Sequence, residues 1–133
     1  MKIDHIGIAT RGIEEAATFW KEALGLDPIE TEEVAEQKVR LVMLPIGESR
    51  IELLEATSPD SPIARFLEKR GPGIHHIAIR VNDIHEALAQ LNNRGARLID
   101  AEPRHGASGC LVAFVHPSST GGVLLELIQS RPQ

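Results

Sequence analysis

The chain has 133 residues, 42% of them hydrophobic and 25% charged, which fits one compact domain or two small fused modules. The net charge of −5, without a basic run, argues against nucleic acid or an anionic membrane as the main partner. The apolar runs are shorter than the roughly 20 residues that a membrane helix needs, and the first residues lack a signal-peptide pattern. The single cysteine, Cys110, excludes an internal disulfide and predicts a cytoplasmic protein.

The first part of the chain has the pattern of a strand, a helix and further strands. Residues 3–9 are rich in isoleucine and predict a strand. Residues 13–24 carry apolar side chains at helical spacing, and Gly25 predicts the end of that helix. Residues 39–44 and 50–55 predict two strands that are joined by a turn.

A short connecting helix is predicted next. Ser61 is a suitable N-cap, Pro62 suits the first helical position, and Gly71 suits the position after the last turn. We expect a first βαβββ module over residues 1–58, the connecting helix within 59–72, and a second βαβββ module over 73–133. Because neither half alone is large enough to bury its sheet, we expect one compact domain overall.

The second part repeats the pattern of the first. Residues 74–81 predict a strand. Asp83 is a suitable N-cap with Glu86 three residues later, and Gly95 predicts the end of the helix that follows. Further strands are predicted at residues 97–100, 111–116 and 123–128.

An internal repeat at an offset of 71 relates the two halves. Two unrelated strand–helix segments would share isoleucines, but they would not be expected to share a histidine and a Glu-Ala pair. The repeat therefore indicates duplication. The residues that meet identical partners 71 positions later are Ile3, His5, Ile6, Ile8, Ile13, Glu15 and Ala16.

One histidine in each half is expected on the sheet face away from the helices. Side chains alternate between the two faces of a strand. Ile6 and Ile8 should pack under the helix, so His5 lies on the other face, and the repeat gives His76 the same position. The other histidines have no symmetric partner and are interpreted as surface or loop residues; they are His75, His85, His105 and His116.

One glutamate in each half interrupts an apolar strand. Glu52 and Glu126 hold nearly equivalent places, and a buried carboxylate is costly unless it is paired or bound to metal. Taken singly, each residue also fits a structural role, such as a hydrogen-bonded histidine or an edge-strand charge that faces solvent. Taken together, His5, Glu52, His76 and Glu126 predict a site for one divalent transition metal ion with open coordination positions.

The chain resembles the vicinal-oxygen-chelate superfamily over essentially its whole length, and within it most closely the methylmalonyl-CoA epimerase family. The Ser-Pro-Ile-Ala helix start and the His-His pair are the features most specific to that branch. The stretches that carry the resemblance are residues 3–9, 51–55, 60–64 with 66–67, 73–77, and 116–117 with 121–124 and 126–127.

This resemblance implies an α+β fold in which the two modules form a cupped sheet around a metal site. It makes His5, Glu52, His76 and Glu126 the ligands of a divalent ion, with Co²⁺ favoured and Mn²⁺, Zn²⁺ or Ni²⁺ also suitable. It implies a homodimer that interconverts (2R)- and (2S)-methylmalonyl-CoA, a step of propionate metabolism. The α-proton would be removed and returned through a metal-stabilised enolate.

The family also uses a second, non-ligand glutamate as an acid/base group. Spacing to Glu52 places this role on Glu36, with Glu33 as the alternative; a solvated loop charge is the structural interpretation of Glu36. Glu126 would be the other acid/base group. The phosphates of the CoA tail would need cationic partners, for which Lys38, Arg40 and Arg104 are the candidates.

The same superfamily contains three alternative functions. A glyoxalase-type enzyme would act on a glutathione hemithioacetal at a similar site, but the chain lacks the expected Tyr- and Phe-rich pocket. A metal-free antibiotic-binding protein would not need four symmetric ligands. An extradiol dioxygenase would take two histidines and one carboxylate from a single module.

Overall fold

The computed structural model describes residues 1–130, and the chain divides into two compact units. The N-terminal unit is His5–His75, and the C-terminal unit is Met1–Asp4 together with the chain from His76 onward. Strands β1 (Lys2–Ala9) and β5 (Gly73–Arg80) therefore each have residues in both units. Within residues 1–130, no helix is long and apolar enough to cross a membrane.

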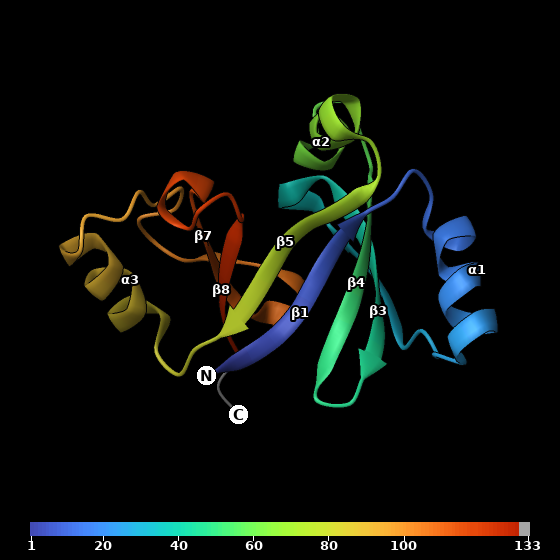
Figure 1. The fold of residues 1–133 in the computed structure, drawn as a ribbon, viewed down its shortest axis with the longest axis horizontal. Coiled ribbons are helices and arrows are strands. Elements are labelled where there is room, and N and C mark those ends of the chain that lie inside the picture. The colour runs from blue at the N-terminus through green and yellow to red at the C-terminus, as the bar shows by residue number, and fades with distance from the viewer. Residues whose placement is uncertain (131–133) are drawn as a thin grey trace. The chain divides into compact units, whose positions relative to one another are not determined.

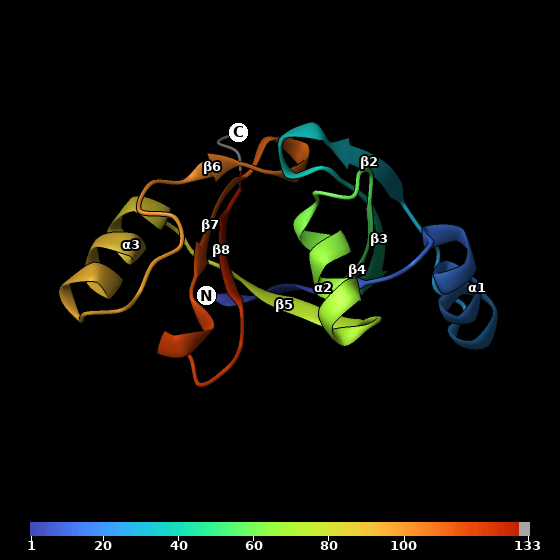
Figure 2. The same cartoon turned by 90° about the horizontal axis from the view of Figure 1, so that it is seen from above.

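The N-terminal unit is a mixed sheet with a helix on one face. Its strands follow the order β2-β3-β4-β1, in which β1 runs parallel to β4 and the other neighbours are antiparallel. Helix α1 lies beside β3 and β4 (Figures 1 and 2). The further elements of this unit are β2 (Glu30–Val34), β3 (Val39–Ile46), β4 (Ser49–Ala56), α1 (Ile13–Leu24) and α2 (Pro62–Arg70).

Helix α1 forms where its apolar spacing predicts it. Ile13 and Ala17 face the sheet and pack in one cluster with Leu44 and Leu53, both of which are fully buried. Gly25 ends the helix in a left-handed conformation with φ 69°, which glycine adopts without steric cost. The predicted end at Gly25 is therefore confirmed.

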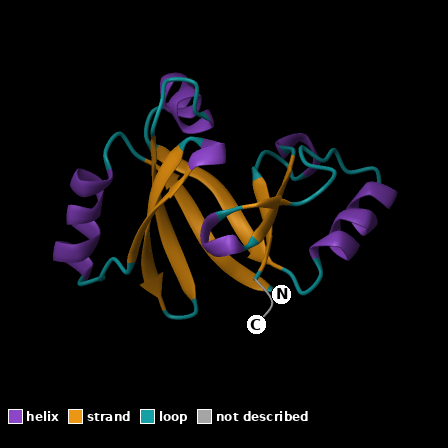
Figure 3. Ribbon diagram, turned by 180° about the vertical axis from the view of Figure 1, so that it is seen from behind, coloured by secondary structure: helices purple, strands orange, loops and turns teal. Residues whose placement is uncertain are grey.

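The C-terminal unit repeats this arrangement. Its strands follow the order β5-β8-β7-β6, with β5 parallel to β8 and the other neighbours antiparallel. Helix α3, at the right of Figure 3, packs against β7 and β8 through a cluster that includes Ile84, Leu88 and Leu127. The further bounds are α3 (Ile84–Asn93), β6 (Arg104–His105), β7 (Leu111–Val115) and β8 (Leu125–Gln129).

Two predictions of strands need correction. Residues 97–100 do not form a strand, because only an isolated bridge joins Leu98 to Val115 and the Asp100 side chain accepts a hydrogen bond from the Phe114 amide at 2.9 Å. The edge strand of this unit is β6 instead. In the other unit, β2 has no range of its own in the sequence prediction. Its sequence, Glu-Thr-Glu-Glu-Val, buries only its last residue and so lacks an apolar alternation.

Candidate metal centre

The first histidine–glutamate pair lies within the N-terminal unit. In the register of β1 with β4, Gly7 aligns with Glu52, so His5, two residues earlier, shares the face of Glu52. Both side chains are buried, with 2% of His5 and 5% of Glu52 exposed. His5 Nε2 lies 3.6 Å from Glu52 Oε2. Ile8 and Ile51 pack instead in the cluster under α1, which confirms the predicted opposite face.

The second pair lies within the C-terminal unit. Ala78 aligns with Glu126 in the register of β5 with β8, so His76 and Glu126 also share a face. His76 Nε2 lies 2.9 Å from Glu126 Oε1, and 4% and 7% of these two residues are exposed. The Phe114 ring meets the His76 imidazole edge-on, with 5.8 Å between the ring centres. This contact restricts how the imidazole turns.

The two pairs obey the same strand register. Residue 7 aligns with Glu52, and residue 78, which is 71 positions later, aligns with Glu126. The internal repeat therefore extends from the sequence to the alignment of the first and last strands of each module. Position 52 plus 71 is 123, so the second glutamate lies three residues later than a rigid repeat would put it. Strand pairing, rather than chain offset, makes the two glutamates equivalent.

The donor groups suit a divalent metal ion. His5, Glu52 and His76 are buried and each offers a metal-ligating atom, and Glu126 offers a carboxylate of the same kind. Imidazole nitrogen and carboxylate oxygen together accommodate Co²⁺, Mn²⁺, Zn²⁺ and Ni²⁺. Taking a carboxylate out of water costs free energy unless a positive partner compensates it. Buried glutamates beside imidazoles are therefore what a cation site needs.

The two candidates for the second acid/base residue lie in different surroundings. Glu36 is exposed in a three-residue 3₁₀ helix, η1 (Ala35–Gln37), between β2 and β3. On β2, Glu33 aligns with Arg40 of the neighbouring strand β3. On the other side of β3, Met43 aligns with Glu52 of β4. Residues 40 and 43 of β3 point to opposite faces, so Glu33 projects from the face opposite to that of Glu52.

Three cations that the sequence offers for the CoA phosphates have carboxylate partners in the structure. Lys38 forms an ion pair with Asp60. Arg40 donates to Glu14 at 3.0 Å and to Glu55 at 3.4 Å. Arg104 Nε lies 3.1 Å from Asp100 Oδ1.

One ion pair beside the site escaped the sequence reasoning. Asp4 is 2% exposed, and Arg80 Nε donates to its Oδ1 at 2.8 Å within the C-terminal unit. Asp4 directly precedes His5, and Arg80 ends the strand that carries His76. The sequence signal for Asp4 is a carboxylate inside an isoleucine-rich strand, and Glu52 likewise interrupts an apolar strand.

The remaining histidines have structural surroundings. His75 meets the Phe66 ring of α2 edge-on, at 5.1 Å between ring centres. His85 and His105 are exposed, as predicted. His116 Nδ1 accepts a hydrogen bond from the Ser118 amide at 3.0 Å and so caps a short 3₁₀ helix.

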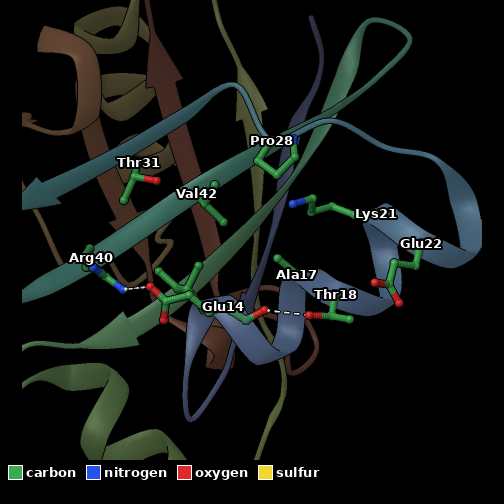
Figure 4. Close-up of a pocket in the computed structure, with 10 residues that line it drawn as sticks. Glu14, Ala17, Thr18, Lys21, Glu22, Pro28, Thr31, Arg40 and Val42 are labelled. Atoms are coloured by element: carbon green, nitrogen blue, oxygen red, sulfur yellow. Dashed lines mark hydrogen bonds and ion pairs between the residues drawn. The ribbon is translucent and has the colours of Figure 1, made fainter.

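A pocket of about 260 Å³ lies between α1, β2 and β3 (Figure 4). The Arg40–Glu14 ion pair lies at its edge. Val42 lines the pocket and also packs in the cluster under α1, whereas the neighbouring Met43 aligns with Glu52. The pocket therefore belongs to the helix-covered face of the sheet, and its lining residues do not include the histidine–glutamate pairs.

Comparison with known proteins connects these features to a family. The profile of the Glyoxalase/Bleomycin resistance protein/Dioxygenase superfamily matches residues 4–114. The uncharacterised protein YqjC of Bacillus subtilis is 43% identical over 130 residues, with 98% of this chain and 93% of that protein covered. The human mitochondrial methylmalonyl-CoA epimerase is 39% identical over 130 residues, with 97% and 74% covered.

A solved structure agrees with this assignment. A variant of Streptomyces coelicolor methylmalonyl-CoA epimerase in complex with 2-nitronate-propionyl-CoA is 39% identical and superposes with a TM-score of 0.94, covering 98% of this chain and 94% of that one. The fold is thus that of the vicinal-oxygen-chelate proteins. With its two symmetric βαβββ halves and this likeness over nearly its full length, the chain belongs to the Glyoxalase/Bleomycin resistance protein/Dioxygenase superfamily and, within it, to the methylmalonyl-CoA epimerase family.

Proposed function

We propose that this protein is a metal-dependent epimerase that interconverts the (2R) and (2S) epimers of methylmalonyl-CoA. The observation that carries the proposal is the pair of symmetric, buried histidine–glutamate pairs in a chain of this family. The relative from Streptomyces coelicolor binds 2-nitronate-propionyl-CoA, an acyl-CoA with an anionic group on its acyl part. An acyl-CoA of similar size and charge is therefore the substrate to test.

The two pairs hold one shared metal ion in this proposal. His5, Glu52, His76 and Glu126 are its ligands, and Co²⁺ is the ion to test first. The internal repeat supports the sharing, because it gives His5 and His76 equivalent places in the two modules. A divalent ion bound there would supply Lewis acidity that stabilises negative charge developing on the thioester oxygen.

Two glutamates would move the proton. The α-carbon between the thioester and the carboxylate is acidic, and epimerisation requires that a proton leaves one face and returns on the other. Glu36 and Glu126 are the acid/base pair in this proposal. The register supports Glu36 over Glu33, because Glu33 projects from the helix-covered face, opposite to that of Glu52.

The oligomeric state and the location of the protein are predictions. A homodimer and a cytoplasmic location are implied by family resemblance and by the single cysteine. Sedimentation velocity would test the dimer.

The decisive measurement is solvent proton exchange at the α-carbon. Metal-stripped protein and protein reloaded with Co²⁺ are each mixed with (2R)-methylmalonyl-CoA in heavy water. We expect deuterium uptake and conversion to the (2S) epimer only in the presence of the metal, and NMR measures both. Glu36→Gln should reduce kcat by about 10²- to 10⁴-fold, because it removes one proton-transfer group.

The matched control is Glu33→Gln, a neighbouring acid that projects from the other face and should leave kcat near the wild-type value. A loss of activity in Glu32→Gln with normal activity in Glu36→Gln would assign the role of base to Glu32, which aligns with Leu41 and so shares the face of Glu52.

Absence of proton exchange by the metal-loaded protein would refute the proposal that the protein is an epimerase. The glutathione hemithioacetal of methylglyoxal would then test the glyoxalase-type alternative.

A further inference from the structure

The turn that carries Glu36 has an unusual backbone. Lys38 closes η1 in the left-handed region, with φ 55° and ψ 45°. Non-glycine residues adopt this region infrequently, because Cβ approaches the following carbonyl. Within residues 1–130, Lys38 and Ser108 are the only non-glycine residues with positive φ. A glycine would fit the turn without this cost, so the lysine side chain needs its own explanation.

The backbone of Lys38 is held from two directions. Its amide donates to the Ala35 carbonyl at 3.1 Å, which closes the turn around Glu36. Its carbonyl accepts from the Thr57 amide at 2.9 Å, in the segment that leads from β4 to α2. The turn that carries Glu36 is therefore attached to the segment just before α2.

The side chain of Lys38 makes a second attachment to the same segment. It forms an ion pair with Asp60, which also accepts a hydrogen bond from Ser58 Oγ at 2.5 Å. The next residue, Ser61, is fully buried and caps α2 by accepting from the Ile63 amide at 3.2 Å. The Asp60 carboxylate thus lies directly before the start of α2 and accepts from both Ser58 and Lys38, although 61% of its side chain is exposed.

We propose that Lys38 is a positioning residue, whose ion pair with Asp60 fixes the turn that presents Glu36 to the substrate. The proposal rests on the proposed function, in which Glu36 transfers the α-proton. A 3₁₀ turn of three residues has few hydrogen bonds of its own, so an external attachment decides where its side chains point. In this role Lys38 serves the turn rather than the phosphates of the CoA tail.

The test compares kcat and KM for methylmalonyl-CoA in the metal-loaded protein. Asp60→Asn and Lys38→Met each break the ion pair, and we expect each to lower kcat about tenfold, because small misplacements of a reacting group cost large factors in rate. KM should change by less than about twofold. The double variant should be no slower than either single variant, and Lys38→Arg should restore most of kcat.

Glu14→Gln is the matched control, and amide hydrogen exchange is a readout that does not depend on activity. Glu14→Gln breaks the exposed Arg40–Glu14 ion pair of the same unit and should leave kcat unchanged. Amide hydrogen exchange at Lys38 and Thr57 should accelerate in Asp60→Asn but not in Glu14→Gln. That readout tests the attachment even if the protein proves to have no epimerase activity.

Three outcomes would overturn the proposal. A raised KM with unchanged kcat in Lys38→Met, without any effect of Asp60→Asn, would make Lys38 a ligand for the CoA phosphates. Unchanged kcat and unchanged amide exchange in both variants would reduce the contact to an ordinary surface ion pair. Normal activity of Glu36→Gln would remove the proposed base, and the amide exchange would then show separately whether the attachment exists.

Discussion

At the scale of single residues, the ionisable groups of this protein fall into a buried set and an exposed set, and burial determines what each set can do. The four buried histidines and glutamates lie on apolar strands, whereas Glu36 and the Lys38–Asp60 pair lie at the surface. A buried glutamate beside an imidazole gains from a cation, while an exposed pair mostly influences local geometry. Single-residue variants therefore separate metal binding from positioning.

The number of metal ions per chain tests whether the two pairs act together. If one ion is shared, the wild-type protein binds one Co²⁺, and both His5→Ala and His76→Ala reduce this to none. The free energy of unfolding should rise by about 4 kcal/mol at a metal concentration a thousand times Kd, and both variants should lose that gain. Metal analysis after dialysis and thermal unfolding with and without Co²⁺ measure these quantities.

The control for this measurement is His85→Ala, which removes an exposed histidine of helix α3 and should keep the ion. Two ions per wild-type chain, with one retained in each single variant, would show that each unit has its own site. That result would contradict the shared centre while leaving the two pairs as metal ligands.

The pKa of Asp60 provides a second residue-scale prediction. The hydrogen bond from Lys38, assisted by Ser58, lowers this pKa from its ordinary 3.8 to about 2. Because the folded-state pKa is depressed, the pair stabilises the folded protein above about pH 3.8, and this contribution is lost as the pH falls towards 2. At pH 3 the wild-type carboxyl should be mostly ionised, and Lys38→Met should raise the Asp60 pKa and so increase the protonated fraction at that pH.

Carboxyl-carbon NMR of Asp60 across pH 2.5 to 5 measures this difference. Lys38→Arg is the matched control, since it keeps a cation and should keep the low pKa. An Asp60 midpoint near 3.8 in the wild-type protein would show that the ion pair does not form in solution.

At the scale of elements, helices α2 and α3 start with a side-chain cap, whereas α1 follows Gly12 and has none. Ser61 and Asp83 each accept a hydrogen bond from a backbone amide of the first turn, at 3.2 Å and 3.1 Å. Such caps satisfy amides that have no partner inside the helix. These are the features that the sequence predicts most reliably, because cap and helix are neighbours in the chain.

Removal of the α3 cap should have a measurable cost. Asp83→Ala should lower the free energy of unfolding by about 1 kcal/mol, because the Glu86 amide loses its acceptor. Asp83→Asn keeps a side-chain oxygen and should stay within a few tenths of a kcal/mol of the wild-type value. Urea unfolding followed by circular dichroism measures both, and equal losses in the two variants would show that charge rather than capping matters here.

At the scale of the whole molecule, the two units share strands. Residues 2–4 of β1 belong to the C-terminal unit and residues 5–9 to the N-terminal unit, while β5 is divided in the opposite sense. A strand that is continuous through both units cannot lose its partners in one unit without disturbing its course in the other. The two units should therefore unfold together, despite the separate cores around Leu53 and Leu127.

The single tryptophan makes this cooperativity measurable. Trp20 packs against the core of the N-terminal unit and reports its unfolding by fluorescence. Leu127→Ala, in the core of the C-terminal unit, should lower stability by about 2–5 kcal/mol and shift the Trp20 transition together with that of circular dichroism. A Trp20 transition that stays at the wild-type midpoint would show that the units unfold independently.

The sequence alone determined the local elements and the identity of the candidate ligands. Helix α1, the capped start of α2 and the strands that carry the histidines and glutamates follow from spacing, caps and alternation, which act between near neighbours. The repeat added the equivalence of His5 and His76. The same logic failed at residues 97–100, where Leu98 makes only an isolated bridge to Val115. It also failed for β2, a polar edge strand that is defined by its pairing with β3 rather than by an apolar alternation.

Only the tertiary structure decided which distant residues meet. The registers of β1 with β4 and of β5 with β8 bring each histidine to its glutamate, and the register of β2 with β3 turns Glu33 away from the face of Glu52. The attachments of Asp4 to Arg80 and of Lys38 to Asp60 also join residues far apart in the chain. Such pairings depend on strand alignment and long-range packing, and these are set by the folded chain as a whole rather than by any local run of residues.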